Sequence, residues 1–225
     1  MLTALLTFAL AAGLIVLLPG PDTLVVLRNL LRHGRRRAAL TVAGILTGLT
    51  VWIAVAALGL SAVLRASTDA YAALRIAGAA YLLWLGIQSL RARRPAPGVA
   101  DALTAGTTNL TGAADPPDAP TQPIRRALLG SGFGSGLATD LLNPKVGVFF
   151  VTFLPGFVPR GESVGTTTLL LGGVFVVETL LYFTALLLLA GRITGWMANP
   201  RVQRRLDRAT GLVLVGFGVR LAVEP

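Results

Sequence analysis

The feature that most constrains this fold is a series of long apolar runs separated by charged segments. A helix needs roughly 20 mainly apolar residues to cross the hydrocarbon core of a bilayer. Only 13% of the 225 residues are charged, and they gather between six apolar runs. The runs are Leu2–Leu31, Ala38–Leu64, Ala70–Leu90, Ala127–Leu154, Val164–Ala190 and Ala209–Val223. The sequence therefore predicts an all-α integral membrane protein with six transmembrane helices, the last of which starts upstream of its short run.

The arginines predict how this protein is oriented in the membrane. Fourteen of them lie between runs one and two, three and four, or five and six, whereas only Arg65, Arg160 and Arg220 belong to the opposite side. Cytoplasmic loops carry the excess of basic residues in membrane proteins. Both termini are therefore predicted to lie outside. The first run lacks the positive start of a signal peptide, so we interpret it as a retained transmembrane helix.

A polar segment divides the chain into two halves. Residues 95–124 are rich in Pro, Ala, Gly and Thr, a composition typical of a flexible linker, and the arginine pattern makes this linker cytoplasmic. Residues 1–94 and 125–225 then hold three runs each. Because three is an odd number, two homologous halves would lie inverted in the membrane, as in many transporters.

Two short motifs lie at related places in the two halves. Pro19-Gly20-Pro21-Asp22 interrupts the first run, and Asn143-Pro144-Lys145 interrupts the fourth. Aligned on Pro21 and Pro144, Asp22 corresponds to Lys145. These two host runs, of 30 and 28 residues, are longer than one span requires. Because proline removes a backbone donor and clashes within a helix, helices 1 and 4 are predicted to be broken near these prolines.

Among the charged residues within the predicted spans, Asp22, Lys145 and Glu178 form the candidate site. Lys145 is the only lysine of the chain, and with Asp22 it would complement the carboxylate and ammonium groups of an amino acid. Alternatively, the two side chains pair with each other or with frayed backbone and only hold the halves together. Glu178 lies in the middle of the fifth run. It is a candidate proton carrier or substrate contact, with a neutral, packed glutamic acid as the alternative.

Composition argues against several other classes of function. The chain has no cysteine and one histidine, so we expect neither a metal site nor a cofactor. The net charge of +10 comes from arginines in short loops, which predicts a lipid bilayer and no nucleic acid as partner. The glycines at 44–48 and 130–136 favour close helix packing. The serines of the second cluster have no histidine nearby, which argues against an intramembrane enzyme.

With these residues in view, the chain resembles the lysine-exporter (LysE/RhtB) family of amino-acid efflux proteins. The resemblance rests on the motifs at 19–22 and 143–145 and on "LRIAGAAYLLWLGIQSLR" in the third run. It implies export from the bacterial cytoplasm, driven by the proton gradient, with Pro19, Gly20, Pro21, Asp22, Asn143, Pro144 and Lys145 in the site. Glu178 is similar to an acidic position often seen in the fifth helix. Many relatives carry Asp or His in the second helix, where this chain has "GLTVW" at 48–52.

The leading hypothesis is thus a secondary transporter of the bacterial plasma (inner) membrane that exports amino acids or their derivatives by proton antiport. A transporter of another small metabolite or a lipid-linked group is the alternative, and a non-transporting membrane protein is a third class. The sequence names neither the substrate nor the coupling ion. It also leaves the oligomeric state open, a homo-oligomer included.

Overall fold

The computed structural model describes residues 1–66, 68–91, 132–159, 161–189 and 200–223, so the predicted linker lies outside the described residues. Every regular element in these ranges is helical. The elements are α1 (Leu2–Leu17), α2 (Pro21–Ala66), α3 (Thr68–Arg91), α6 (Gly132–Leu141), α7 (Pro144–Val148), η2 (Phe149–Phe153), η3 (Leu154–Phe157), α8 (Val164–Leu188) and α10 (Pro200–Val223).

Within the described part of the chain, two helices are long and apolar enough to cross a membrane. They are Pro21–Gly59 and Val164–Leu188. The helix pair Gly132–Leu141 and Pro144–Phe157, bent by 49°, would be a third span if it crosses as one unit. The all-helical membrane class is confirmed, whereas the six-span inverted repeat stays a prediction.

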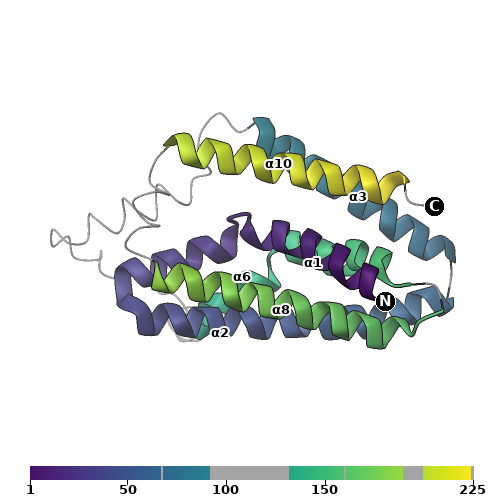
Figure 1. The fold of residues 1–225 in the computed structure, drawn as a ribbon, viewed down its shortest axis with the longest axis horizontal. Coiled ribbons are helices and arrows are strands. Elements are labelled where there is room, and N and C mark those ends of the chain that lie inside the picture. The colour runs from purple at the N-terminus through teal and green to yellow at the C-terminus, as the bar shows by residue number, and fades with distance from the viewer. Residues whose placement is uncertain (67, 92–131, 160, 190–199, 224–225) are drawn as a thin grey trace, which may run out of the picture.

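α2 contains a turn that the sequence pattern alone does not predict. Arg32–Arg37 was expected to form a loop between two spans, but α2 reaches from Pro21 to Ala66 and departs from helical geometry only at Gly34, with φ 81° and ψ 179°. A positive φ is easily adopted only by glycine. One residue therefore takes the place of the predicted loop, and Figure 1 shows the two arms of α2 running back alongside each other.

The first and fourth apolar runs are each divided between two helices. α1 ends at Leu17 and α2 begins at Pro21, while α6 ends at Leu141 and α7 begins at Pro144. Proline is well accommodated at the first position of a helix, because the amide hydrogen it lacks would have no partner there. The non-helical residues between these helices bring polar backbone groups to the depth of the apolar elements.

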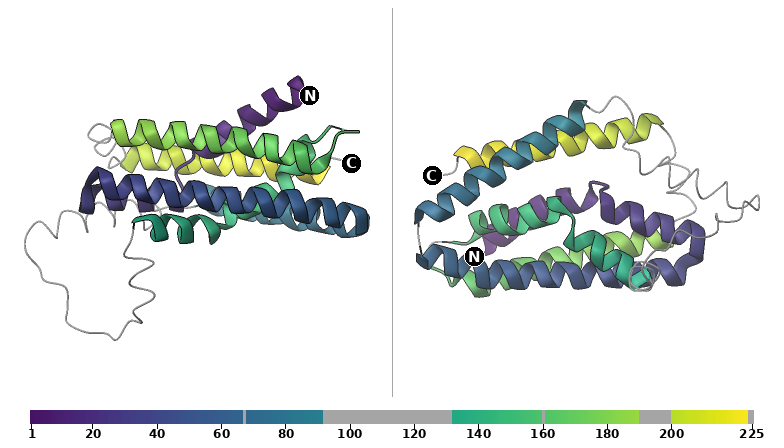
Figure 2. Two further views of the ribbon diagram at one scale, coloured as in Figure 1. Left: turned by 90° about the horizontal axis from the view of Figure 1, so that it is seen from below. Right: turned by 180° about the vertical axis from the view of Figure 1, so that it is seen from behind.

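The helices form two groups. α3 and α10 lie side by side, and the other helices form a bundle next to them (Figures 1 and 2). The bundle core is apolar and contains a cluster of aromatic rings from α1, α7–η3 and α8, including Phe8, Phe149 and Phe175. The start of α1 and the end of α10 lie at the same end of the molecule in Figure 1, opposite the turn within α2.

Glycines bring α6 unusually close to α2. A Cβ atom on Gly44 would overlap the carbonyl oxygen of Phe133, and one on Gly136 would overlap the carbonyl oxygen of Thr41. Small residues of this kind let helix backbones approach closely in membranes. The packing interpretation of the two glycine clusters is therefore confirmed at these positions. This contact fixes α6 against α2 and so places the end of α6, with Asp140, inside the bundle.

Candidate functional site

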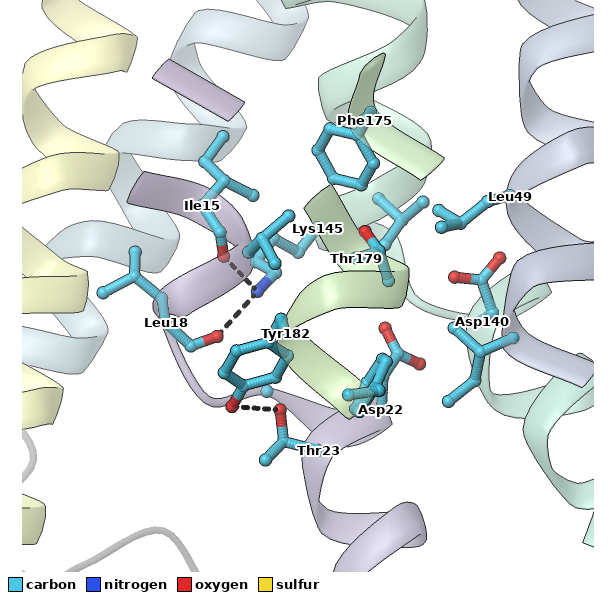
Figure 3. A pocket seen from close by; sticks show the side chains of 15 residues that line it. Ile15, Leu18, Asp22, Thr23, Leu49, Asp140, Lys145, Phe175, Thr179 and Tyr182 are labelled. Carbon is cyan, nitrogen blue, oxygen red and sulfur yellow. Dashed lines mark hydrogen bonds between the residues drawn. The ribbon is translucent and has the colours of Figure 1, made fainter. Parts of the chain in front are cut away.

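A cavity lies where the broken helices meet α8. The space between its walls is about 380 Å³ when the open solvent at its mouth is included, and the centre of a water molecule can reach about 30 Å³ of it. Its charged lining residues are Asp22 from α2, Asp140 from α6 and Lys145 from α7, and the hydroxyl groups of Thr23, Thr179 and Tyr182 also line it. Figure 3 shows these side chains converging from different helices. The structure therefore brings the predicted acid and base of the two motifs into one place.

Lys145 caps the end of α1. Its ammonium group donates to the backbone carbonyl oxygens of Ile15 and Leu18, at 3.4 and 3.2 Å. The last carbonyls of a helix lack intrahelical partners and carry a partial negative charge, so a cation is favourable there. The described contacts of this ammonium are thus with frayed backbone rather than with the carboxylate of Asp22.

Asn143 connects the two motifs directly. Its side-chain amide donates to Oδ2 of Asp22 at 2.7 Å, while its own Oδ1 accepts from the backbone amide of Lys145 at 3.1 Å. The second bond is the usual N-cap arrangement, and Pro144 occupies the first turn behind it. One side chain therefore both starts α7 and orients the carboxylate of Asp22.

Asp140 is a site residue that we did not assign from the sequence. Its side chain is 0% exposed, and neither carboxylate oxygen has a hydrogen-bond partner. The carboxyl group packs against Gly48 of α2, where any Cβ atom would collide with it. Trp52 donates from its indole nitrogen to the backbone carbonyl of Asp140 at 3.3 Å. The feature of the sequence that could have identified Asp140 is its position in an apolar run, four residues before Pro144.

Hydroxyl groups complete the polar side of the cavity. Thr23 and Tyr182 share a hydrogen bond of 3.3 Å between α2 and α8 (Figure 3). The hydroxyl of Thr179, which is buried, has no partner, and neither has Oδ1 of Asp22. Buried polar atoms in proteins are normally hydrogen-bonded, so unpartnered atoms that line a cavity mark places where a ligand or water can bind.

The remaining predicted site residues lie around or beside this cavity. Gly20 lines it, and a Cβ atom there would be 3.2 Å from the ammonium of Lys145. Pro19 lies in the link between α1 and α2, which Pro21 begins. Glu178 is not among the lining residues: its carboxylate lies 3.8 Å from the Cβ position of Gly13 on α1, and one of its oxygens is buried without a partner.

A second cavity lies beside the break between α6 and α7. It encloses about 940 Å³ of empty space and is more open than the first. Its lining is largely apolar and aromatic and includes Trp52, Tyr81 and Pro144. Asn143 also lines it. Asn143 therefore lines the larger cavity and also donates to Asp22, which lines the charged one.

The known proteins that this chain resembles include a translocator family and amino-acid efflux proteins. Residues 14–225 match the family model described as LysE type translocator. The chain is 31% identical to a homoserine/homoserine lactone efflux protein of Salmonella typhi, over 96% of this chain and 94% of the relative. It is 30% identical to a threonine efflux protein of Escherichia coli (strain K12) over the full length of both.

A membrane protein of Bacillus subtilis (strain 168), YrhP, is 29% identical over 98% of this chain and 99% of its own length. No solved structure matches the chain. The family model covers nearly all of the sequence, including the motifs at 19–22 and 143–145 and every residue that lines the charged cavity. The chain therefore belongs to the LysE type translocator family.

Proposed function

We propose that this protein is a secondary transporter that exports amino acids or their derivatives by proton antiport. The observation that carries the proposal is the meeting of Asp22 and Lys145, from two broken helices, at one cavity with unpartnered polar atoms. A zwitterionic substrate offers a carboxylate to the ammonium of Lys145 and an ammonium to the carboxylate of Asp22. Intramembrane charges of this kind generally face a substrate or ion path.

The hydroxyl groups beside these charges favour a small polar amino acid as substrate. Thr23, Thr179 and Tyr182 can exchange hydrogen bonds with a hydroxyl or amide side chain. The relatives named for threonine and for homoserine and its lactone support this choice. Export should be measured as loss of labelled threonine, homoserine and homoserine lactone from loaded cells that express the protein. Equal loss from cells without it, for the whole panel, would contradict the proposal.

The second cavity favours the alternative of a larger, more apolar cargo. Its greater volume and its lining by Trp52 and Tyr81 suit an apolar or lipid-linked group better than a zwitterion. The two functions differ in which cavity they need. Trp52→Ala combined with Tyr81→Ala should impair export of an apolar cargo, whereas substitution of Asp22 should impair export of an amino acid.

We further propose that six spans form two inverted repeats with both termini outside. The placement of the start of α1 and the end of α10 at one end of the molecule, and of the arginine-rich turn of α2 at the other, supports this arrangement. Reporter fusions after Pro97 and Pro225, both outside the described residues, test it. Alkaline phosphatase should be active only at Pro225 and green fluorescent protein only at Pro97. An active phosphatase at Pro97 would overturn the topology.

Asn143→Asp isolates the bond from Asn143 to Asp22. Aspartate still caps α7, because its oxygen can accept from the amide of Lys145, but it faces Asp22 with a second carboxylate. A hydrogen bond to a charged group contributes about 1.5–3 kcal/mol, so we expect the rate of export at limiting substrate to fall about 10- to 100-fold.

The amount of Asn143→Asp protein in the membrane should stay near that of the wild type, which quantitative blotting measures. Asn143→Ala serves as the comparison, since it loses both bonds and should also lower the melting temperature. Wild-type export by Asn143→Asp would mean that the orientation of Asp22 does not matter to transport.

Proton antiport also needs a carboxyl group that binds and releases the exchanged proton. The sequence predicts Glu178 for this role. Because its carboxylate lies toward Gly13 of α1 rather than among the residues that line the charged cavity, coupling through Glu178 would require a separate proton path between α1 and α8.

A further inference from the structure

We propose that Asp140 is the residue that carries the exchanged proton, so that proton and substrate compete inside one cavity. The inference rests on the proposed export of amino acids and assigns its coupling step. Its basis is a carboxyl group that is fully buried, has no hydrogen-bond donor on either oxygen, and lines the same cavity as Asp22 and Lys145.

The surroundings of Asp140 leave only a few ways to accommodate a negative charge. On α2 its carboxyl group packs against Gly48, and Leu49 lines the same cavity; neither residue offers a side-chain donor. The titratable groups that share its cavity are Asp22 of α2, Lys145 of α7 and Tyr182 of α8. An ionised carboxylate without a donor is costly at membrane depth. The carboxyl group of Asp140 must therefore bind a proton, lie next to a cation, or alternate between these two states.

Among the described residues that line the cavity, the one cation, Lys145, already has hydrogen-bond acceptors. The ammonium of Lys145 donates to the carbonyls of Ile15 and Leu18 on the α1 side, and Asp22, which Asn143 orients, lines the same cavity. In Figure 3 the carboxyl groups of Asp22 and Asp140 lie on the side away from these carbonyls. Two acids thus share one base, and the second acid is satisfied by a bound proton when no substrate is present.

Substrate binding would change this balance. The ammonium group of an amino acid adds a positive charge beside Asp22 and Asp140, which favours release of the proton from Asp140. When the substrate leaves, the added charge leaves with it and Asp140 takes up a proton again. One carboxyl group thereby alternates between a bound proton and a neighbouring ammonium, and mutually exclusive binding of this kind is the requirement for antiport.

The first test measures proton coupling in vesicles that contain the purified protein. For one-for-one exchange, a difference of about one pH unit supports about a tenfold accumulation of labelled threonine or homoserine. Asp140→Asn should still exchange labelled for unlabelled substrate across the membrane but should build no gradient when a pH difference is imposed. Glu162→Gln, which removes an exposed acid from the turn before α8, is the matched control and should behave as the wild type.

Glu178→Gln decides between the two coupling candidates. The proposal expects it to keep its response to the pH difference. The proposal is overturned if Asp140→Asn accumulates substrate as the wild type does, or if Glu178→Gln alone loses the response. Exchange of none of the panel by the wild type would instead reject amino-acid transport itself.

A second measurement does not depend on transport. Infrared spectra of the protein in lipid should contain the carbonyl stretching band of a protonated carboxyl group at neutral pH, and Asp140→Asn should lack it. If Asp140→Asn fails to reach the membrane, Gly48→Ala serves instead. Its methyl group presses on the carboxyl group of Asp140 while keeping every acid, and it should shift the band. An identical band in Asp140→Asn and wild type would overturn the assignment.

Discussion

Replacing Lys145 by alanine should abolish export while the protein still reaches the membrane. In the proposed site the ammonium of Lys145 binds the substrate's carboxylate, and no other lysine exists in the chain. Loss of one partner from a buried, hydrogen-bonded charge pair costs about 2–5 kcal/mol, which corresponds to roughly 30-fold to several thousand-fold in affinity. The measurement is efflux of labelled threonine and homoserine at limiting internal concentration, corrected for the amount of protein.

Two comparisons separate substrate binding by Lys145 from its structural role. Lys145 also donates to the carbonyls of Ile15 and Leu18, so some loss of stability is expected with Lys145→Ala and should appear as a lower melting temperature in detergent. Homoserine lactone has no free carboxylate, so its export should fall much less than that of homoserine. Equal loss for the two compounds would show that Lys145 acts mainly through the end of α1. Wild-type export by Lys145→Ala would exclude any transport role.

Much of the fold follows from the apolar pattern, because a bilayer forces every backbone polar group to find a partner within the protein. That requirement predicts helices in all the apolar runs, and the described elements are helical. The turn at Gly34 is a feature that the apolar pattern does not predict. The arginines around it predict a loop from their charge, yet a single glycine with positive φ makes the turn. Charge reports which side of the membrane a segment faces, but it carries little information about backbone dihedral angles.

Only part of the candidate site could be predicted from the sequence, because some of its contacts arise only from tertiary packing. Asp22 and Lys145 could be found because they sit beside prolines at corresponding places in the two halves. Asp140 has no counterpart in that comparison, and its role depends on α6 lying against Gly48, which only the tertiary packing reveals. The same holds for the bonds from Lys145 to the end of α1, since a sequence does not show which carbonyls a long side chain will reach.

Replacing Asp22 should have an effect as large as the loss of Lys145. Asp22→Ala removes the carboxylate that the substrate's ammonium is proposed to meet, and it leaves the amide of Asn143 without its acceptor. Asp22→Asn keeps an oxygen for that amide and removes only the charge. Both variants should therefore lose export of threonine and homoserine by roughly 30-fold to several thousand-fold, by the same charge-pair argument. Their membrane amounts should differ, with Asp22→Asn nearer to the wild type.

Exchanging the two charges, as Asp22→Lys with Lys145→Asp, tests whether the pair acts only as a structural link. A simple ion pair between the halves would be restored by the exchange, and export would return. The contacts of these two side chains predict that export will not return. An aspartate at 145 is shorter and has no proton to donate, so the carbonyls of Ile15 and Leu18 would face a carboxylate instead of an ammonium. A lysine at 22 would likewise point its own donors at the amide of Asn143. The doubly substituted protein should consequently export no better than either single variant, and recovery of export would reassign both residues to holding the broken helices together.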